Sequence, residues 1–277
     1  MKYLILIFFL SLNVMASAKV SVSIKPIHSI VALLTDGVNE PDLLIKGNQS
    51  AHHFFMRPSH AMKIMNSDLV VLIDKDFEAG FQKITNNLDK NKIFYFSNTS
   101  KNILSSKDNL NSSESINPHL WLDKENVINF ARELSEKLRK LYPENSKQLQ
   151  KNLDLFLMKF SMASQSSLPN NHKKKIILQS NSAEYFLNDN NIKDYQIISN
   201  DHEGHISIKK YNEIIKLSDG NKIACLIADY NSNYDLIEKL AKEINTQLII
   251  IDVIGRNSKD YYEFTQSISE KFYKCLQ

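Results

Sequence analysis

The sequence lacks an excess of charge of either sign. It holds 34 Lys and Arg against 31 Asp and Glu, and without Lys2, which belongs to an N-terminal leader, the balance is 33 − 31 = +2. A balance so close to zero gives no reason to expect nucleic acid or an anionic membrane surface as a partner. Beyond the leader, no stretch is apolar for long enough to cross a membrane. The length of 277 residues and the 43% apolar content can bury one large core or two modest ones.

The first 18 residues have the pattern of a cleaved signal peptide. Lys2 supplies a positive start, the run from Tyr3 to Leu12 is apolar, and Ala16-Ser17-Ala18 fits a small-x-small cleavage site. The apolar run is too short to span a bilayer. No cysteine follows the cleavage site, so the sequence gives no sign of a lipid anchor. We therefore expect a mature chain that starts at Lys19 and is free in the periplasm.

Cysteine is scarce, because the chain holds only Cys225 and Cys275. In an exported chain a lone pair of cysteines usually forms a disulfide, which here would close a loop of about 50 residues. Two buried free thiols are the alternative. A disulfide would pin the C-terminal helix to a strand of the second half of the chain.

Short apolar runs alternate with segments of helical periodicity along the mature chain. The expected strands are 20–24, 42–45, 68–73 and 92–96 in the first half and 175–178, 196–199, 223–228 and 247–252 in the second. Helical patterns lie between them, for instance at 27–34 and 58–65. Strands separated by helical connections predict parallel βαβ units. The expected fold class is α/β, with two lobes that each contain a four-stranded, mainly parallel sheet.

A helical stretch without glycine separates the two halves, from about Pro143 to Gln165. Its proline suits the first turn of a helix. Its apolar side chains share one face, and they are Leu149, Leu153, Phe156, Leu157 and Phe160. The predicted organisation is a signal peptide at 1–18, a first lobe at 19–142, a stiff connecting helix at 143–166 and a second lobe at 167–277. Two open sheets that face one another leave a crevice at the C-terminal ends of their strands, where ligands bind.

Two motifs carry the histidines of interest. Asn117-Pro118-His119-Leu120-Trp121-Leu122 contains the chain's one tryptophan, and a helical pattern opens directly after it. His119 is therefore held at a loop-to-helix junction, which suits a metal ligand or a catalytic group, although such a histidine can also merely pack in a hinge. The other motif places His52 and His53 in the loop after the second strand. Adjacent side chains point in different directions, so at most one of the two is expected to face a given metal.

Together the motifs resemble the cluster A-I metal-binding proteins of ABC importers, and among them the periplasmic zinc-binding proteins. The matching segments are Gly-x-x-Ser-x-His-x-Phe-x-x-Arg-Pro-Ser at 47–59, Ser-Asp-Leu-Val-Val at 67–71 and Asn-Pro-His-Leu-Trp-Leu at 117–122. Further matches lie at 23–29, 204–205 and 251–255, and the cysteine pair is placed as in the family's C-terminal disulfide. The resemblance spans essentially the whole mature chain. It implies two βα lobes joined by one rigid helix, a metal site between them and a membrane permease as partner.

The resemblance also implies three metal ligands. The first falls on His52, five positions before Arg57-Pro58-Ser59, and the second falls on His119. The acidic position near the family's C-terminus falls on Asp252, at the end of the last expected strand, where the crevice rule independently places a ligand group. Two histidines and a carboxylate make a zinc site with water in the fourth position. Mn²⁺ or Fe²⁺ is the alternative ion, because fewer imidazoles relax the preference for zinc.

One histidine of the family is missing from this chain. Counting back from Tyr185-Phe186 places Ser180 at its position, and a neutral serine hydroxyl is a poor zinc ligand. His202 or His205 is a candidate to complete the site, although the family's Gly-His pair is not implied to be a ligand. The histidine-rich, acidic loop that often precedes the second motif is also absent, and serine and asparagine fill that place.

Two other classes of function stay open at this point. Two histidines, a carboxylate and a bound water also describe catalytic zinc, but the sequence has no His-Glu-x-x-His pair. The nearest acidic residues, Glu184 and Glu203, are expected to be solvated. A metal-free binding protein that descends from the family gains weight from the lost histidine. The favoured hypothesis is a soluble, monomeric periplasmic receptor, and not an enzyme, that captures zinc or another divalent metal and hands it to a permease.

Overall fold

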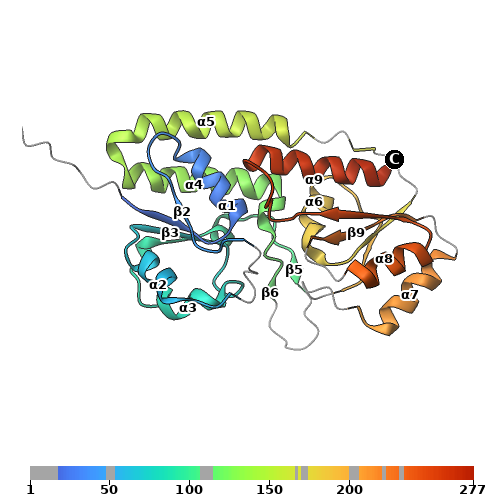
Figure 1. Ribbon diagram of the computed structural model, residues 1–277. Coiled ribbons are helices and arrows are strands. Elements are labelled where there is room, and N and C mark those ends of the chain that lie inside the picture. Colours follow the sequence, from blue (N-terminus) through green and yellow to red (C-terminus); the bar gives the residue numbers. More distant parts are fainter. Residues whose placement is uncertain are drawn as a thin grey trace, which may run out of the picture.

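The computed structural model describes residues 18–47, 54–106, 115–165, 168–169, 174–199, 206–219, 223–230 and 234–277. In these ranges the chain forms two lobes side by side, with a layer of long helices over both (Figure 1). The leader expected at 1–18 lies outside the described residues, apart from Ala18. In the described part of the chain, every helix is too short or too polar to cross a membrane.

The first lobe contains a four-stranded sheet with the strand order β2-β1-β3-β4. Its strands all run parallel, and they are β1 (Val20–Val22), β2 (Asp42–Leu43), β3 (Leu69–Leu72) and β4 (Ile93–Tyr95). Helices α1 (Lys25–Leu34), α2 (Pro58–Met65) and α3 (Ala79–Thr85) connect them. The β3 residues are all apolar and all buried, which is the pattern of a parallel strand covered on both faces.

The second lobe repeats this plan with the strand order β10-β9-β7-β8. Its strands are also parallel, and they are β7 (Lys175–Leu178), β8 (Tyr195–Ile197), β9 (Ile223–Asp229) and β10 (Gln247–Ile251). The helices are α6 (Glu184–Asp189), α7 (Ile208–Ser218), α8 (Tyr234–Glu243) and α9 (Tyr261–Leu276). The predicted α/β fold of two four-stranded parallel sheets is therefore confirmed.

A two-stranded antiparallel ladder of β5 (Ser105–Ser106) and β6 (Ser115–Ile116) lies between the lobes in Figure 1. This ladder was not predicted from the sequence. Two-residue strands contain too few positions to show a period of two. The ladder leads directly into the Asn117-Pro118-His119 segment.

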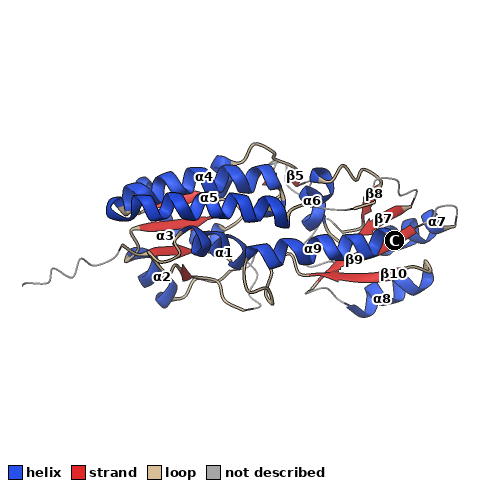
Figure 2. Ribbon diagram, turned by 90° about the horizontal axis from the view of Figure 1, so that it is seen from above, coloured by secondary structure: helices blue, strands red, loops and turns tan. Residues whose placement is uncertain are grey.

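Two long helices, α4 (Lys124–Leu141) and α5 (Ser146–Ala163), form an antiparallel pair over the first sheet (Figure 2). Asp123 caps α4, because its carboxylate accepts the Asn126 backbone N–H at 2.8 Å. The helix expected between the halves is present as α5, preceded by a 3-10 turn at Pro143–Asn145. It packs on α4 and α1 of the first lobe and on α9 of the second. The exact limits of the lobes and the stiffness of this connector stay predictions.

The contact between α5 and α9 is made by buried aromatic rings. Phe156 and Phe160 of α5 face Tyr261 of α9, with ring centroids 6.3 and 5.6 Å from it. These three rings are at most 3% exposed. The Tyr261 hydroxyl also donates a hydrogen bond to the Trp121 carbonyl. The same buried ring therefore fixes α9 to the connecting helix and to the loop that carries His119.

We expect Phe156→Ala to lower the free energy of unfolding by about 3–5 kcal/mol, because it removes a ring that is 1% exposed and leaves a cavity between the lobes. The matched control is Met158→Ala, because Met158 lies on the same helix and is 56% exposed. This substitution should change the free energy of unfolding by less than about 0.5 kcal/mol. Urea unfolding of both variants measures the difference. Equal losses would mean that the α5–α9 contact contributes no special stability.

Cys225 of β9 and Cys275 of α9 form a disulfide, with 5.4 Å between their Cα atoms. This confirms the predicted bond between a strand of the second half and the C-terminal helix, and it excludes two free thiols. The bond and the aromatic contact hold α9 at its two ends. Because β9 ends at Asp229, the disulfide also ties α9 to a strand that reaches the crevice.

Candidate metal centre

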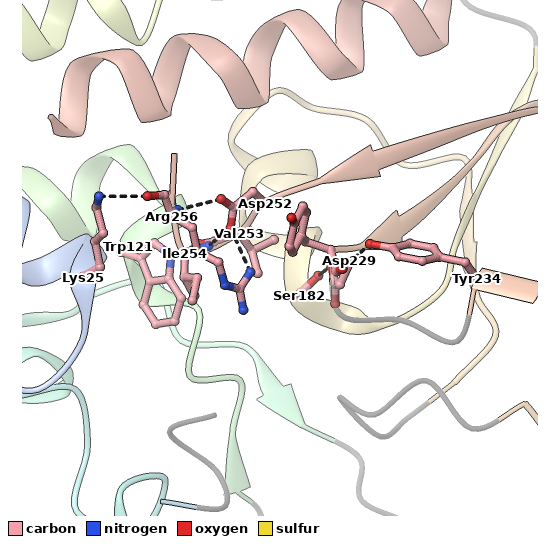
Figure 3. A network of polar contacts seen from close by, with 10 residues as sticks. Lys25, Trp121, Ser182, Asp229, Tyr234, Asp252, Val253, Ile254 and Arg256 are labelled. Carbon is pink, nitrogen blue, oxygen red and sulfur yellow. Dashed lines mark hydrogen bonds and ion pairs between the residues drawn. The ribbon is translucent and has the colours of Figure 1, made fainter. Parts of the chain in front are cut away.

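The candidate site lies where the C-terminal ends of the parallel strands meet the space between the lobes. Strands β9 and β10 point toward the first lobe in Figure 1, and Asp229 and Asp252 stand at their ends. Two hydrogen bonds join the lobes here: Lys25 Nζ donates to the Arg256 carbonyl at 3.0 Å, and Trp121 Nε1 donates to the Val253 carbonyl at 2.7 Å. Figure 3 shows both donors reaching the turn after β10. Ligands of α/β sheets bind at such an edge.

His119 is 5% exposed, and Asn117 orients its ring. The Asn117 Nδ2 donates to the Asn181 carbonyl at 2.9 Å, which fixes the amide so that Oδ1 faces His119. This Oδ1 accepts the His119 backbone N–H at 3.2 Å and lies 2.8 Å from ring atom Nδ1. The hydrogen-bond network therefore assigns the proton to Nδ1 and the lone pair to Nε2, which is the tautomer that a metal ligand needs.

The loop that carries His119 is also tied to the second lobe through Tyr185 and through Trp121. Tyr185 OH donates to the Asn117 carbonyl at 3.0 Å, and the ring of His119 lies 5.1 Å from the Trp121 ring that bonds Val253. Trp121 is buried, as its predicted anchor role requires. The structure thus brings the His119 loop next to both the Ser180 segment and the turn after β10.

Glu184 belongs to the support of this loop, and the expectation that it is solvated is wrong. It is partly buried, accepts the Tyr195 hydroxyl at 3.1 Å and receives Asn117 Nδ2 at 3.4 Å. Burial raises the pKa of its carboxyl, and the hydrogen bonds from Tyr195 and Asn117 oppose that rise. The sequence did not reveal this role, because the partners come from other elements.

Asp252 directly follows β10, at the predicted end of the last strand, and opens a tight turn. Its Oδ2 accepts the Arg256 backbone N–H at 2.6 Å, and its Oδ1 lies 3.2 Å from the Arg256 guanidinium. Gly255 has φ of +62°, and an added Cβ would come within 2.8 Å of Phe264 Cδ2. The turn therefore requires glycine, and it folds Arg256 back onto Asp252.

Ser180, which the resemblance places at the position of the missing histidine, is hydrogen-bonded to a carboxylate that was not predicted from the sequence. Its hydroxyl donates to Asp229 Oδ2 at 2.7 Å, and Ser182 donates to Oδ1 at the same distance. Asp229 pairs in register with Ile251, so it stands one strand away from Asp252 at the same edge of the sheet. The available signal was an aspartate at the end of a buried apolar run, where the crevice rule places ligand groups.

We expect Ser180→His to tighten zinc binding by at least about tenfold and to favour zinc over Mn²⁺. The new imidazole would take a position now left to water, and Asp229 already lies where it can accept the second ring N–H, as second-shell carboxylates of zinc sites do. Competition titrations with zinc and Mn²⁺ measure both effects. Ser182→His, which also faces Asp229, is the matched control, and an equal gain there would reject the assignment of Ser180.

Glu78 is a buried carboxylate at the equivalent edge of the first sheet. It is 1% exposed, and its Oε2 accepts the Ile73 backbone N–H at 2.6 Å, directly after β3. Its Oε1 and the nearby Ser23 Oγ are buried without a hydrogen bond of good geometry to any described residue. Burial raises the pKa of Glu78 to about 7, against the opposing hydrogen bonds. In the protonated form Glu78 has an O–H that Ser23 can accept.

A pH dependence of stability follows from Glu78. The pKa of Glu78 in the folded protein is raised from 4.5 to about 7. Glu78 therefore makes its full contribution to the free energy of unfolding below about pH 4.5, and this contribution, about 3 kcal/mol in total, is lost as the pH rises to 7. Glu78→Gln keeps the shape without the charge, so the variant should exceed the wild type in stability at pH 8 and match it near pH 4.5. Urea unfolding from pH 4.5 to 8 tests this, with the exposed Glu136→Gln as control. Parallel profiles of wild type and Glu78→Gln would contradict it.

Several predicted residues, namely His52, His53, His202, His205 and Glu203, lie outside the described residues. Within the described ranges, no three His, Cys, Asp or Glu side chains gather at one point, and the predicted ligand set includes His52 from outside them. Phe54, the first described residue after His52, is buried and stacks on Phe81 at 4.7 Å. Gly80 approaches the Phe54 carbonyl so closely that a Cβ would lie 2.4 Å from its oxygen. From Phe54 onward, the described chain therefore lies beside α3 of the first lobe.

Comparisons with known proteins agree with this architecture. The family model of ZnuA, the periplasmic component A of the zinc-uptake complex, matches residues 20–275, and the chain belongs to this family. An uncharacterised protein of Rickettsia prowazekii is 30% identical, over 91% of this chain and 80% of its own length. The high-affinity zinc uptake system protein ZnuA of Haemophilus ducreyi is 24% identical, over 96% of both chains.

Solved structures share the fold. The Cd-bound periplasmic metal binding protein of Candidatus Liberibacter asiaticus superposes with a TM-score of 0.79 at 18% identity, over 94% of this chain and all of its own. The Mn-bound form of the same protein gives a TM-score of 0.78 with the same identity and coverage. At this identity the likeness carries the fold and not the ligand set.

Proposed function

We propose that the chain is a periplasmic receptor that captures a divalent metal and delivers it to the permease of an ABC importer. Zinc is the favoured ion. The proposed ligands are His52, His119 and Asp252, with water in the fourth position. One observation carries the proposal: Asn117 Oδ1 lies 2.8 Å from Nδ1 of the buried His119 ring, a contact that favours the tautomer with its lone pair on Nε2. Histidines that bind a metal donate their other ring N–H to a partner of this kind.

The proposed donor set suits zinc and also permits the binding of harder divalent ions. Two neutral imidazoles and one carboxylate form the open zinc sites known in proteins. The loss of the family's histidine at Ser180 and the presence of Asp229 beside it make the surroundings richer in oxygen, which favours Mn²⁺ or Fe²⁺ more than a three-histidine site does. The relative from Haemophilus ducreyi is named for zinc uptake, and the solved relative binds Cd and Mn.

Delivery requires release, and the buried packing between the lobes argues against a wide hinge motion. The buried rings between α5 and α9 form a continuous contact, and such packed interfaces resist opening. We infer that the metal leaves through small shifts of the loops that carry its ligands. The permease then receives the ion from the edge where the two sheets face each other.

Zinc titration of metal-stripped protein against a competing chelator tests the proposal. We expect one zinc ion per chain and the loss of this binding in His119→Ala. Metal analysis of protein purified from its native periplasm identifies the ion that is carried. Failure of the folded wild type to bind zinc, Mn²⁺ or Fe²⁺ would leave a metal-free binding protein. Turnover of generic ester or phosphate substrates by the zinc-loaded protein would instead favour a hydrolase.

A further inference from the structure

Asp252 already has a cationic partner within its own turn. The Arg256 guanidinium lies 3.2 Å from Oδ1, and the two side chains are 16% and 21% exposed, so water screens this pair only partly. The family segment that aligns with 251–255 ends before Arg256, so the resemblance assigned no role to this residue. The side chain proposed to bind the dication is thus held by a unit positive charge.

The guanidinium is attached loosely on its other sides. It stacks over the Tyr230 ring at 5.2 Å from the centroid, and one of its nitrogens donates to Asp252. The Arg256 Nε–H is buried and has no hydrogen-bond partner in the described part of the chain. A face-on contact with an aromatic ring tolerates sliding, and a single bond to a carboxylate can be exchanged. Arg256 is therefore in a position to leave Asp252 without breaking a network.

The backbone of the same turn orients Asp252 without help from the guanidinium. Asp252 Oδ2 accepts the Arg256 backbone N–H at 2.6 Å, and Ile254 N–H approaches Oδ1 at 3.4 Å. Lys25, from the first lobe, holds the Arg256 carbonyl at 3.0 Å (Figure 3). These contacts remain when the guanidinium moves, so the carboxylate keeps its place.

A divalent ion and a guanidinium on the same carboxylate oxygen of Asp252 oppose each other. They compete for the Oδ1 electrons, and like charges a few ångströms apart repel strongly where solvent is limited. Arginine keeps its charge at every accessible pH, so it cannot relieve the repulsion by losing a proton. The metal has to displace it.

We infer that Arg256 is an internal counter-cation of the receptor: its guanidinium occupies Asp252 in the metal-free protein, the metal displaces it, and its return to Asp252 promotes release. The inference rests on the proposed function and adds a residue that sets affinity and release rate. The receptor then gives up its metal without having to expose an unpaired carboxylate, because the arginine takes the place of the ion.

The test compares Arg256→Gln, which removes the charge, with Arg256→Lys, which keeps it. Zinc affinity comes from chelator competition. Dissociation rates come from stopped-flow fluorescence of Trp121, the one tryptophan, which bonds Val253 next to Asp252. We expect Arg256→Gln to lower the zinc Kd by at least about tenfold, mainly through slower dissociation, and Arg256→Lys to change it by less than about threefold. The metal-free Arg256→Gln protein should also melt at a lower temperature, while zinc should stabilise it more than it stabilises the wild type.

Unchanged or weaker zinc binding by folded Arg256→Gln would overturn the inference and leave Arg256 as a clamp for Asp252. If Arg256→Gln does not fold, Tyr230→Leu tests the same idea at an exposed site. Removal of the ring support should tighten zinc binding while the charge is retained, and a weaker or unchanged Kd would again overturn the inference. A wild type that binds no metal would refute the proposed function itself, whereas a binding wild type with unresponsive variants refutes only the role of Arg256.

Discussion

His119→Ala is expected to weaken zinc binding by at least about a hundredfold, the largest single effect that the proposed site allows. A two-donor site cannot replace the water shell of the ion, and the site would lose the nitrogen ligand that Asn117 orients. Chelator competition with metal-stripped protein measures the loss. The melting temperature of the metal-free variant shows whether the fold survives.

Matched variants separate ligands from neighbours. His52→Ala should match His119→Ala, whereas His53→Ala should have little effect, because the resemblance implies His52 as the ligand. Asn117→Ala should cost about 10–100-fold, since it removes the partner that sets the tautomer of His119. Equal losses from His52→Ala and His53→Ala would show that the wrong member of the pair is assigned. An unaffected His119→Ala protein would reject the site.

The fold could be predicted because its signals are local. Buried parallel strands such as β3 read as short apolar runs, and α5 shows its buried face in the spacing of Leu149, Phe156 and Phe160. The ends of strands follow from the same runs, so Asp252 could be placed at the edge of a sheet. The antiparallel ladder of β5 and β6 was missed, because two residues cannot show a period.

The polar partners of the site could not be predicted, because they come from distant elements. Asp229 meets Ser180 across a separation of 49 residues, and Asn117 meets Asn181 across 64. Periodicity describes which face of an element is buried, and it contains no information about the group that faces it. Arg256 is close to Asp252 in sequence, but the pairing depends on a turn that only Gly255 permits. The family resemblance identified positions, and the structure added the groups that tune them.

Zinc affinity is also expected to fall steeply as the pH drops below about 6.5, the ordinary pKa of imidazole. Protons and metal compete for the same ring nitrogen, so the zinc affinity has its full value above this pKa and decreases below it. Each histidine ligand contributes up to one power of ten per pH unit, and the two proposed ligands give a limiting slope of two. A third histidine ligand, at 202 or 205, would raise the limit to three.

Competition titrations with a chelator of known pH behaviour, from about pH 7.5 to 5.5, measure this slope. Ser180→His should raise the limiting slope by one, because it adds an imidazole, and His119→Ala should lower it by one. Glu78→Gln is the control for pH effects on folding, because its carboxyl titrates in the same range, with a pKa of about 7, but belongs to the edge of the first sheet. Its zinc-binding profile should therefore follow the wild type. A flat profile in the wild type would reject histidine ligation altogether, because the ordinary pKa of imidazole lies within the range that is titrated.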